Sequence, residues 1–310
     1  MRRTVIPLAV VLAAAAACAP ATEGPGDPAE LDALELNDVA AAAQARAVAL
    51  EFLQAYARSP TDDGRSLQRL MEGLRAEQWA HWLAVQHDAF PGTLEGSLQL
   101  GYLGPARPVR LEDGSLDDLV AYAVLVRATI AFEVTDPQGD PLAPFQRVTD
   151  GVIVLVRSPD GAFRVLSFDR DGLRLDQFFQ VFEGASDRRD GVRVAVRTLL
   201  HSDQWQFGLE ITNGTRRPLR ILPDLTTLLA DGTEPATDRR PLTTFSRPIP
   251  PGATVEGLLT FAAPEQTTDL DLRIAFEDTG GETTGFVFGL PTPPSADGPG
   301  TEANSGPSVG

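Results

Sequence analysis

Lysine is absent from this chain, and cysteine occurs once, as Cys18. The 26 basic residues, all arginine, stand against 43 acidic ones, so the formal net charge is -17. Nucleic-acid binding needs a concentrated basic surface, and this composition argues against such a partner. A single cysteine cannot form an intramolecular disulfide, so hydrophobic burial must hold the domains together.

Several motifs of catalytic and ligand-binding sites are also missing. The chain has no Gly-x-Ser-x-Gly motif and no glycine-rich phosphate loop. The stretch Ser167-x-Asp169-x-Asp171-Gly172 matches the opening of a calcium loop, but Phe178 stands where a bidentate glutamate is needed. A turn after a strand explains this stretch better. We therefore expect no metal site and no cofactor.

The first 18 residues have the layout of an export signal. Arg2 and Arg3 precede an apolar run over residues 5–17, which is too short for a lasting transmembrane helix and is typical of a signal-peptide core. The small residues before Cys18 resemble the bacterial lipoprotein signal, although that family usually has leucine where this chain has Ala15. An ordinary secretory peptide cut near residues 15–17 is the alternative.

The lipoprotein resemblance implies a diacylglyceryl group, with chains such as palmitate, on Cys18, which becomes the first residue of the mature protein. It places the protein in the cell envelope, anchored to the membrane on its extracytoplasmic side. Residues 19–36 contain many small residues, proline and glycine, and predict a flexible tether.

The next segments predict helices and then strands. Apolar residues recur at helical spacing over residues 38–58 and 66–86. Beyond Gly92 the period becomes two, and it predicts four strands, over residues 97–102, 119–135, 148–157 and 163–168. The longest strand should contain a bend or bulge. Ser158 to Gly161 should form a hairpin turn.

Helices followed by a meander of long strands form an α+β layout. This order, with the ending Gly161-Ala162-Phe163-Arg164-Val165-Leu166-Ser167-Phe168-Asp169, resembles the NTF2-like (SnoaL-like) cone fold. The resemblance covers residues 38–182 and implies a domain over residues 37–184, in which a curved antiparallel sheet wraps around a long helix. It also implies a pocket between helices and sheet, which serves some family members as an isomerase or hydrolase site and others for binding only.

A charged connector over residues 184–191 should separate this domain from an all-β one. About seven short strands divided by turns predict a β-sandwich over residues 191–290. They are expected at residues 192–199, 205–212, 219–223, 226–230, 254–262, 270–277 and 285–290. Asn213-Gly214 and Asp231-Gly232 should supply positive φ angles at corners. Residues 291–310 have little apolar content and are expected to be disordered.

The second domain carries three marks of a known family. They are Thr212-Asn213-Gly214 at a strand end, the turn Asp231-Gly232-Thr233, and Pro251-Gly252 before Gly257-Leu258-Leu259-Thr260-Phe261. Together they resemble the immunoglobulin-like domains of unknown function found in many bacterial lipoproteins. That resemblance implies an interaction or structural module without enzymatic activity.

The candidate site residues lie in and near the second predicted helix. His81 and His87, with Asp88, could transfer protons in an apolar cleft. The six-residue separation of the two histidines does not place them on one helical face, which disfavours a shared metal site. Structural histidines and aromatic core residues are the simpler reading. Three aromatic residues could line a ligand pocket: Trp79, Trp82 and Tyr102.

We therefore expect a lipid-anchored extracytoplasmic protein without catalytic activity, which binds a small apolar ligand or an envelope protein. The alternative is an enzyme with isomerase- or hydrolase-like proton transfer in the NTF2-like pocket. A third possibility is an assembly role, in which both domains pack against envelope proteins.

The lipid anchor gives the first testable prediction. Cys18→Ser should release the protein into the medium, because two acyl chains bind a bilayer firmly, at about 0.8 kcal/mol for each buried methylene. The neighbouring change Ala19→Ser should leave it attached. Cell fractionation with immunodetection measures both, and membrane retention of Cys18→Ser would contradict the anchor.

Overall fold

The computed structural model describes residues 28–62, 64–90, 92–109, 121–201, 204–233, 241–264 and 269–292, with side chains from residue 39 onward. The predicted signal sequence, Cys18, the tether up to residue 27 and the tail from residue 293 lie outside the described residues. Residues from Ala41 onward belong to one compact unit. Residues 28–40 of the first helix belong to the other unit, and only their helical conformation is described.

The described residues contain four α-helices: α1 (Pro28–Arg58), α2 (Arg65–Met71), α3 (Arg75–Asp88) and α4 (Leu175–Phe178). α1 begins earlier than the helical spacing over residues 38–58 predicted, with Pro28 in the first turn, where proline is tolerated. Residues 28–36, predicted as part of a flexible tether, are therefore helical. The single helix expected over residues 66–86 is divided in two, because Gly73 adopts a φ of 76° that interrupts it. In the described part of the chain no helix is long and apolar enough to cross a membrane.

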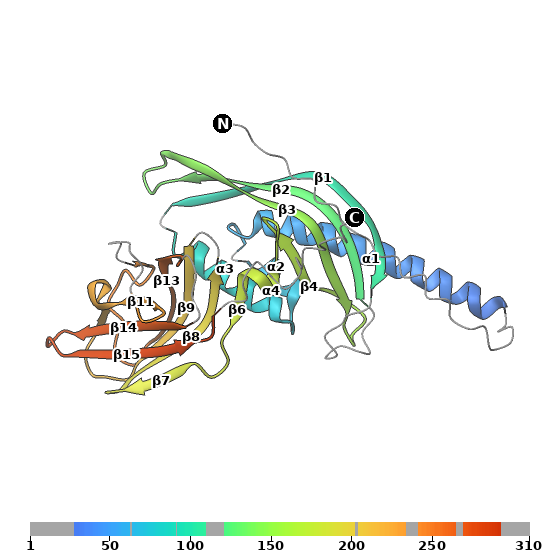
Figure 1. Ribbon diagram of the computed structural model, residues 1–310. Coiled ribbons are helices and arrows are strands. Elements are labelled where there is room, and N and C mark those ends of the chain that lie inside the picture. The colour runs from blue at the N-terminus through green and yellow to red at the C-terminus, as the bar shows by residue number, and fades with distance from the viewer. Residues whose placement is uncertain are drawn as a thin grey trace, which may run out of the picture. The chain divides into compact units, whose positions relative to one another are not determined.

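A five-stranded antiparallel sheet follows in chain order, and its first three strands are long and curved (Figure 1). Its strands are β1 (Thr93–Val109), β2 (Ala121–Thr135), β3 (Pro141–Arg157), β4 (Phe163–Arg170) and β5 (Leu173–Arg174). The long strand β2 bends, as expected (Figure 1), and the extra residues at the register shifts on its two sides lie in β1 and β3. The hairpin turn is confirmed as well: the Gly161 amide donates to the Ser158 carbonyl at 2.8 Å.

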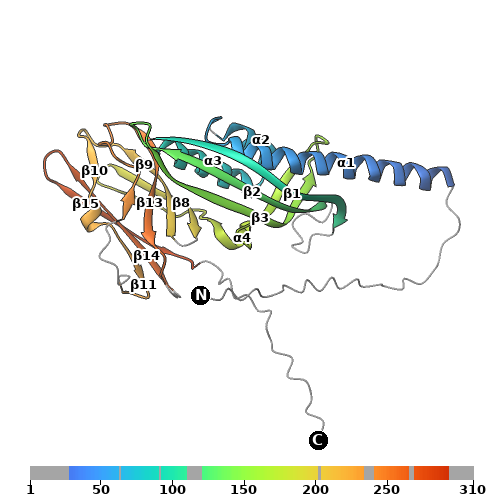
Figure 2. The same cartoon turned by 90° about the horizontal axis from the view of Figure 1, so that it is seen from above.

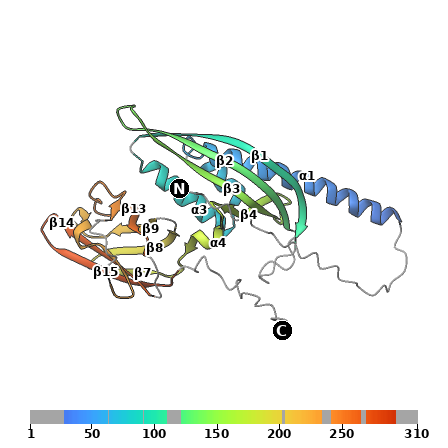
Figure 3. The same ribbon diagram turned by 45° about the horizontal axis from the view of Figure 1, so that its top comes forward.

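The remaining strands form two further antiparallel sheets (Figures 2 and 3). The six-stranded sheet contains β6 (Phe179–Val181), β7 (Ser186–Arg189), β8 (Val192–His201), β9 (Gln204–Asn213), β12 (Leu242–Thr243) and β13 (Thr254–Ala262). The four-stranded sheet contains β10 (Leu219–Ile221), β11 (Thr227–Ala230), β14 (Leu270–Asp278) and β15 (Thr283–Leu290). A 3-10 turn, η1 (Pro223–Leu225), connects β10 to β11.

The two sheets share one hydrophobic core, in which Phe207 and Ile211 of β9 belong to the same buried cluster as Leu272 and Phe276 of β14. The predicted β-sandwich content is therefore confirmed.

One of the two predicted corners of the sandwich is correct. Asp231 and Gly232 have φ angles of 51° and 75°. The other is wrong: Gly214 has no positive φ, and Asn213 is a buried bridging residue whose Nδ2 donates to the carbonyls of Arg217 and Ile249.

The predicted fold class, an α+β NTF2-like cone followed by an immunoglobulin-like sandwich, is wrong. The described residues are mostly β, with three antiparallel sheets beside four helices, which fits a β-rich fold. β1 and β3 run for 17 residues each, well beyond the strands expected at residues 97–102 and 148–157. The added end of β3, residues 141–147, is almost entirely exposed and lacks the apolar alternation that marks a half-buried strand. The added ends of β1 alternate in burial, but they contain glycine and proline, which do not signal a strand.

The helices and the five-stranded sheet enclose a core centred on Phe168 of β4. Its ring centroid lies 4.7 Å from that of Trp79 in α3, 4.9 Å from Phe52 in α1 and 5.8 Å from Phe178 in α4. Such tilted aromatic pairs add to the stabilisation from burial.

Replacing this central ring should destabilise the fold strongly. We expect Phe168→Ala to lower the free energy of unfolding by about 3–5 kcal/mol, because it leaves a cavity among rings that cannot all move in. Tyr102→Ala is the matched control, because Tyr102 is 49% exposed, and it should cost about 0.5 kcal/mol. Denaturant unfolding measures both, and equal losses would show that Phe168 is not the centre of this core.

Candidate ligand-binding site

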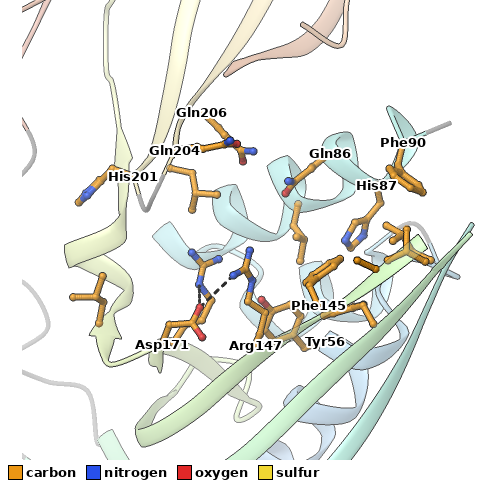
Figure 4. A pocket seen from close by; sticks show the side chains of 18 of the residues that line it. Tyr56, Gln86, His87, Phe90, Phe145, Arg147, Asp171, His201, Gln204 and Gln206 are labelled. Atoms are coloured by element: carbon orange, nitrogen blue, oxygen red, sulfur yellow. Dashed lines mark ion pairs between the residues drawn. The ribbon is translucent and has the colours of Figure 1, made fainter. Parts of the chain in front are cut away.

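A cavity of about 1090 Å³ lies where α3, the first half of β3 and the β8–β9 hairpin meet (Figure 4). This volume is at the upper end of the range of about 300–1,000 Å³ that is usual for small-molecule sites. Its walls come from elements that are far apart in the sequence.

One wall of the cavity is apolar. Tyr56 of α1 and Phe132 of β2 form its buried part, with ring centroids 6.2 Å apart. The ring of Phe145 in β3 stacks on that of Phe132, with centroids 4.8 Å apart. Phe145 is 39% exposed and Leu142 is 46% exposed. These two β3 residues therefore form an apolar rim at the solvent side of the cavity.

The opposite wall is the outer face of the β8–β9 hairpin. Side chains alternate along β9, and Trp205 and Phe207 point into the sandwich core. Gln204 and Gln206 therefore occupy the other face, where they line the cavity. His201 of β8 pairs with Trp205 at the end of the hairpin and also lines the cavity. The carboxamides of Gln86 in α3 and of Gln177 in α4 also line it, so the cavity offers several neutral hydrogen-bonding groups.

Two guanidinium groups and one carboxylate lie between these walls. Arg147 Nη1 and Arg170 Nε lie 3.5 and 3.7 Å from Asp171 Oδ2. Asp171 has a φ of 52°, and its Oδ1 accepts a hydrogen bond from the Val148 amide at 3.0 Å, which fixes the turn after β4. Arg170 is only 5% exposed and stacks over the Phe178 ring at 4.2 Å.

Three polar atoms of this lining are buried without a hydrogen-bond partner among the described residues: His87 Nδ1, His201 Nε2 and Arg170 Nε. Buried polar groups in folded proteins are nearly always satisfied, so three unpartnered atoms in the side chains around one cavity set this region apart, while the atoms themselves are closed off from its open space. Figure 4 shows His201 and His87 on opposite sides of the cavity, with Arg147 and Asp171 between them.

Burial controls the charge of both histidines. Desolvation lowers the pKa of His201 to about 4, and the positive charge of Arg170 acts in the same direction. Desolvation also lowers the pKa of His87, against the opposing influence of the Ser59 backbone and of Asp88 and Asp62. Both rings are therefore mostly neutral at pH 7.

The structure separates the residues predicted as a site. Trp79 is a core residue, while Tyr102 and Asp88 are exposed and line neither this cavity nor the cleft described next. His87 alone among them lines the cavity.

His81 and Trp82 line a second cleft of about 590 Å³, beside four glutamates and Arg197. The His81 Nε2 atom lies 3.0 Å from Glu256 Oε2, an exposed ion pair. In the described residues no group of three histidine, cysteine or carboxylate side chains is placed to hold a metal ion.

Sequence reasoning missed most of the cavity. The turn at Asp171-Gly172 was recognised, but not the pairing of Asp171 with Arg147 from another strand. Gln204 and Gln206 gave one usable signal: they alternate with Trp205 and Phe207, which assigns them to the outer face. No sequence pattern indicated that this face is covered by α3.

The low pKa of His201 makes stability depend on pH with a definite sign. The His201 ring binds a proton near pH 6.5 in the unfolded chain but only near pH 4 in the folded chain. Protonation therefore favours the unfolded chain: the contribution of this group to stability is fully present above pH 6.5 and is lost as the pH falls toward 4. His201→Gln should remove this loss, so the free energy of unfolding of the variant should rise relative to that of the native chain as the pH falls from 6.5 to 4.

Denaturant titrations of both chains at pH 7, 5.5 and 4.5, followed by tryptophan fluorescence, measure this difference. The comparison cancels other titrating groups, such as Asp169, whose pKa burial raises. A difference that stays constant with pH would contradict the burial of a neutral His201.

No family model matches the chain, and a search of curated proteins finds no match either. The resemblance to immunoglobulin-like lipoprotein domains therefore stays a prediction. Any functional conclusion depends on the geometry of the cavity.

Proposed function

We propose that the protein binds a small, largely apolar molecule in the cavity between α3, β3 and the β8–β9 hairpin. The observation that carries the proposal is the combination, in one cavity of about 1090 Å³, of an apolar wall with polar and charged side chains. A site of this kind holds an amphipathic molecule: the apolar wall supplies affinity and the polar groups fix orientation.

The leader sequence supports a setting for this activity outside the cytoplasm. Residues 1–18 predict export and acylation, so we propose that a diacylglyceryl group on Cys18 holds the protein at the membrane surface. The net charge of -17 disfavours direct adhesion of the protein to an anionic membrane surface, which leaves the lipid as the attachment.

Proton-transfer catalysis receives less support from the geometry. His87 lies in the cavity, but its neighbour Asp88 is exposed, and no carboxylate among the described residues forms a hydrogen bond with the His87 ring. A general acid or base needs an oriented partner or substrate within hydrogen-bond reach. The single described carboxylate of the lining, Asp171, is already paired with two arginines.

Binding of an apolar chain should depend on its length and on the rim of the cavity. Each buried methylene contributes about 0.8 kcal/mol, so affinity should rise about fourfold per carbon from octan-1-ol to decan-1-ol. Leu142→Arg should weaken decan-1-ol binding by at least about tenfold, because it puts a charge on the apolar rim.

Leu125→Arg is the matched control, because Leu125 is a leucine of the same sheet, 53% exposed and outside the cavity. Isothermal titration calorimetry measures all three proteins. Absence of binding by the native chain, or equal weakening in both variants, would contradict the proposal.

A further inference from the structure

We infer that the ligand carries a single carboxylate, which Arg147 and Arg170 hold at one end of the cavity. This inference rests on the proposed function, and it specifies the chemical class of the ligand: an amphiphile with an apolar body and one anionic end, such as a medium-chain fatty acid.

The charges of the cavity favour one negative charge. Its described lining contains two guanidinium groups and one carboxylate, and the neutral histidines add nothing at pH 7. The surplus is one positive charge, on a chain whose net charge is -17. A monoanion balances this surplus, whereas a dianionic phosphate would leave a buried excess of negative charge.

Arg170 has donor capacity that the protein does not use. Its side chain is 5% exposed, and Nε has no hydrogen-bond partner among the described residues. The Asp171 carboxylate lies 3.7 Å from Nε, which is within ion-pair range but beyond hydrogen-bond range. Arg170 nevertheless lines the cavity, so a second carboxylate there would add a pairing partner for its guanidinium group, whose planar fork suits that geometry.

The apolar and charged parts of the cavity stand in the right order for such a molecule. Phe145 and Arg147 are two residues apart on β3, so they share a face and lie about 7 Å apart. Arg147 also stacks over the Phe145 ring at 5.5 Å. A chain lying against Phe145 and Phe132 would therefore reach the guanidinium group with its end.

The test compares two ligands of equal length, decanoate and decan-1-ol, with the native chain at pH 7 by isothermal titration calorimetry. The native chain should bind decanoate about tenfold more tightly, as expected for added hydrogen bonds to a charged group. Arg147→Gln should remove most of this advantage, because it should weaken decanoate binding far more than decan-1-ol binding.

Arg127→Gln is the matched control. Arg127 lies on the neighbouring strand β2 and pairs with Asp150, as Arg147 pairs with Asp171. Its side chain is 71% exposed and does not line the cavity. Its removal should change neither ligand's affinity. Equal loss in both variants would indicate a general effect of surface charge and would overturn the inference.

A second variant keeps the test independent of Arg147. Asp171→Asn retains the side-chain oxygen that accepts from the Val148 amide, and asparagine tolerates the left-handed φ at this position. It removes the competing negative charge, so decanoate should bind about threefold more tightly. Weaker binding would show that Asp171 does not compete with the ligand for the arginines.

The outcomes separate this inference from the proposed function. If the native chain binds acid and alcohol equally, the carboxylate assignment fails and an apolar ligand remains. Decylamine, which has the same chain length and a positive charge, is titrated as a third ligand. If it binds most tightly, Asp171 is the recognition group and the inference is overturned. If none of the three ligands binds, the proposed function fails together with the inference.

Discussion

The contact between Trp82 of α3 and Gly208 of β9 is the constraint on which the cavity depends. A Cβ atom at residue 208 would lie 2.7 and 2.8 Å from two atoms of the Trp82 ring, and it would also meet Thr198 Oγ1. Real side chains do not approach so closely, so only glycine lets the indole lie flat on the strand. The contact fixes α3 on the outer face of the sandwich, and the His81–Glu256 ion pair lies beside it.

Both walls of the cavity are set by this contact. Leu83 follows Trp82 in α3 and lines one side, while Gln206 lies two residues before Gly208 and lines the other. The gap between helix and hairpin is then bordered by β3, which contributes the apolar rim and Arg147. A rigid junction explains how a cavity can persist between elements that pack closely elsewhere, and preorganised walls reduce the cost of ordering on binding.

The sequence allowed some elements to be predicted and not others, for identifiable reasons. The alternation from Val124 to Val134 and the turn at Ser158 to Gly161 are local signals, and both predictions were correct. The exposed end of β3 carries no such alternation, and glycine and proline interrupt the ends of β1, so the full length of both strands was missed. The cavity joins α3, β3 and β9 through tertiary contacts, so only His87 of its lining was named in advance.

The most direct measurement is a crystal structure of the mature protein purified from the cell envelope without added ligand. The proposed binding role predicts elongated electron density between Leu83 and Gln206, with its polar end within hydrogen-bond distance of Arg147. A closed interior with no space between Phe132 and Gln206, and therefore no room for a ligand, would contradict it.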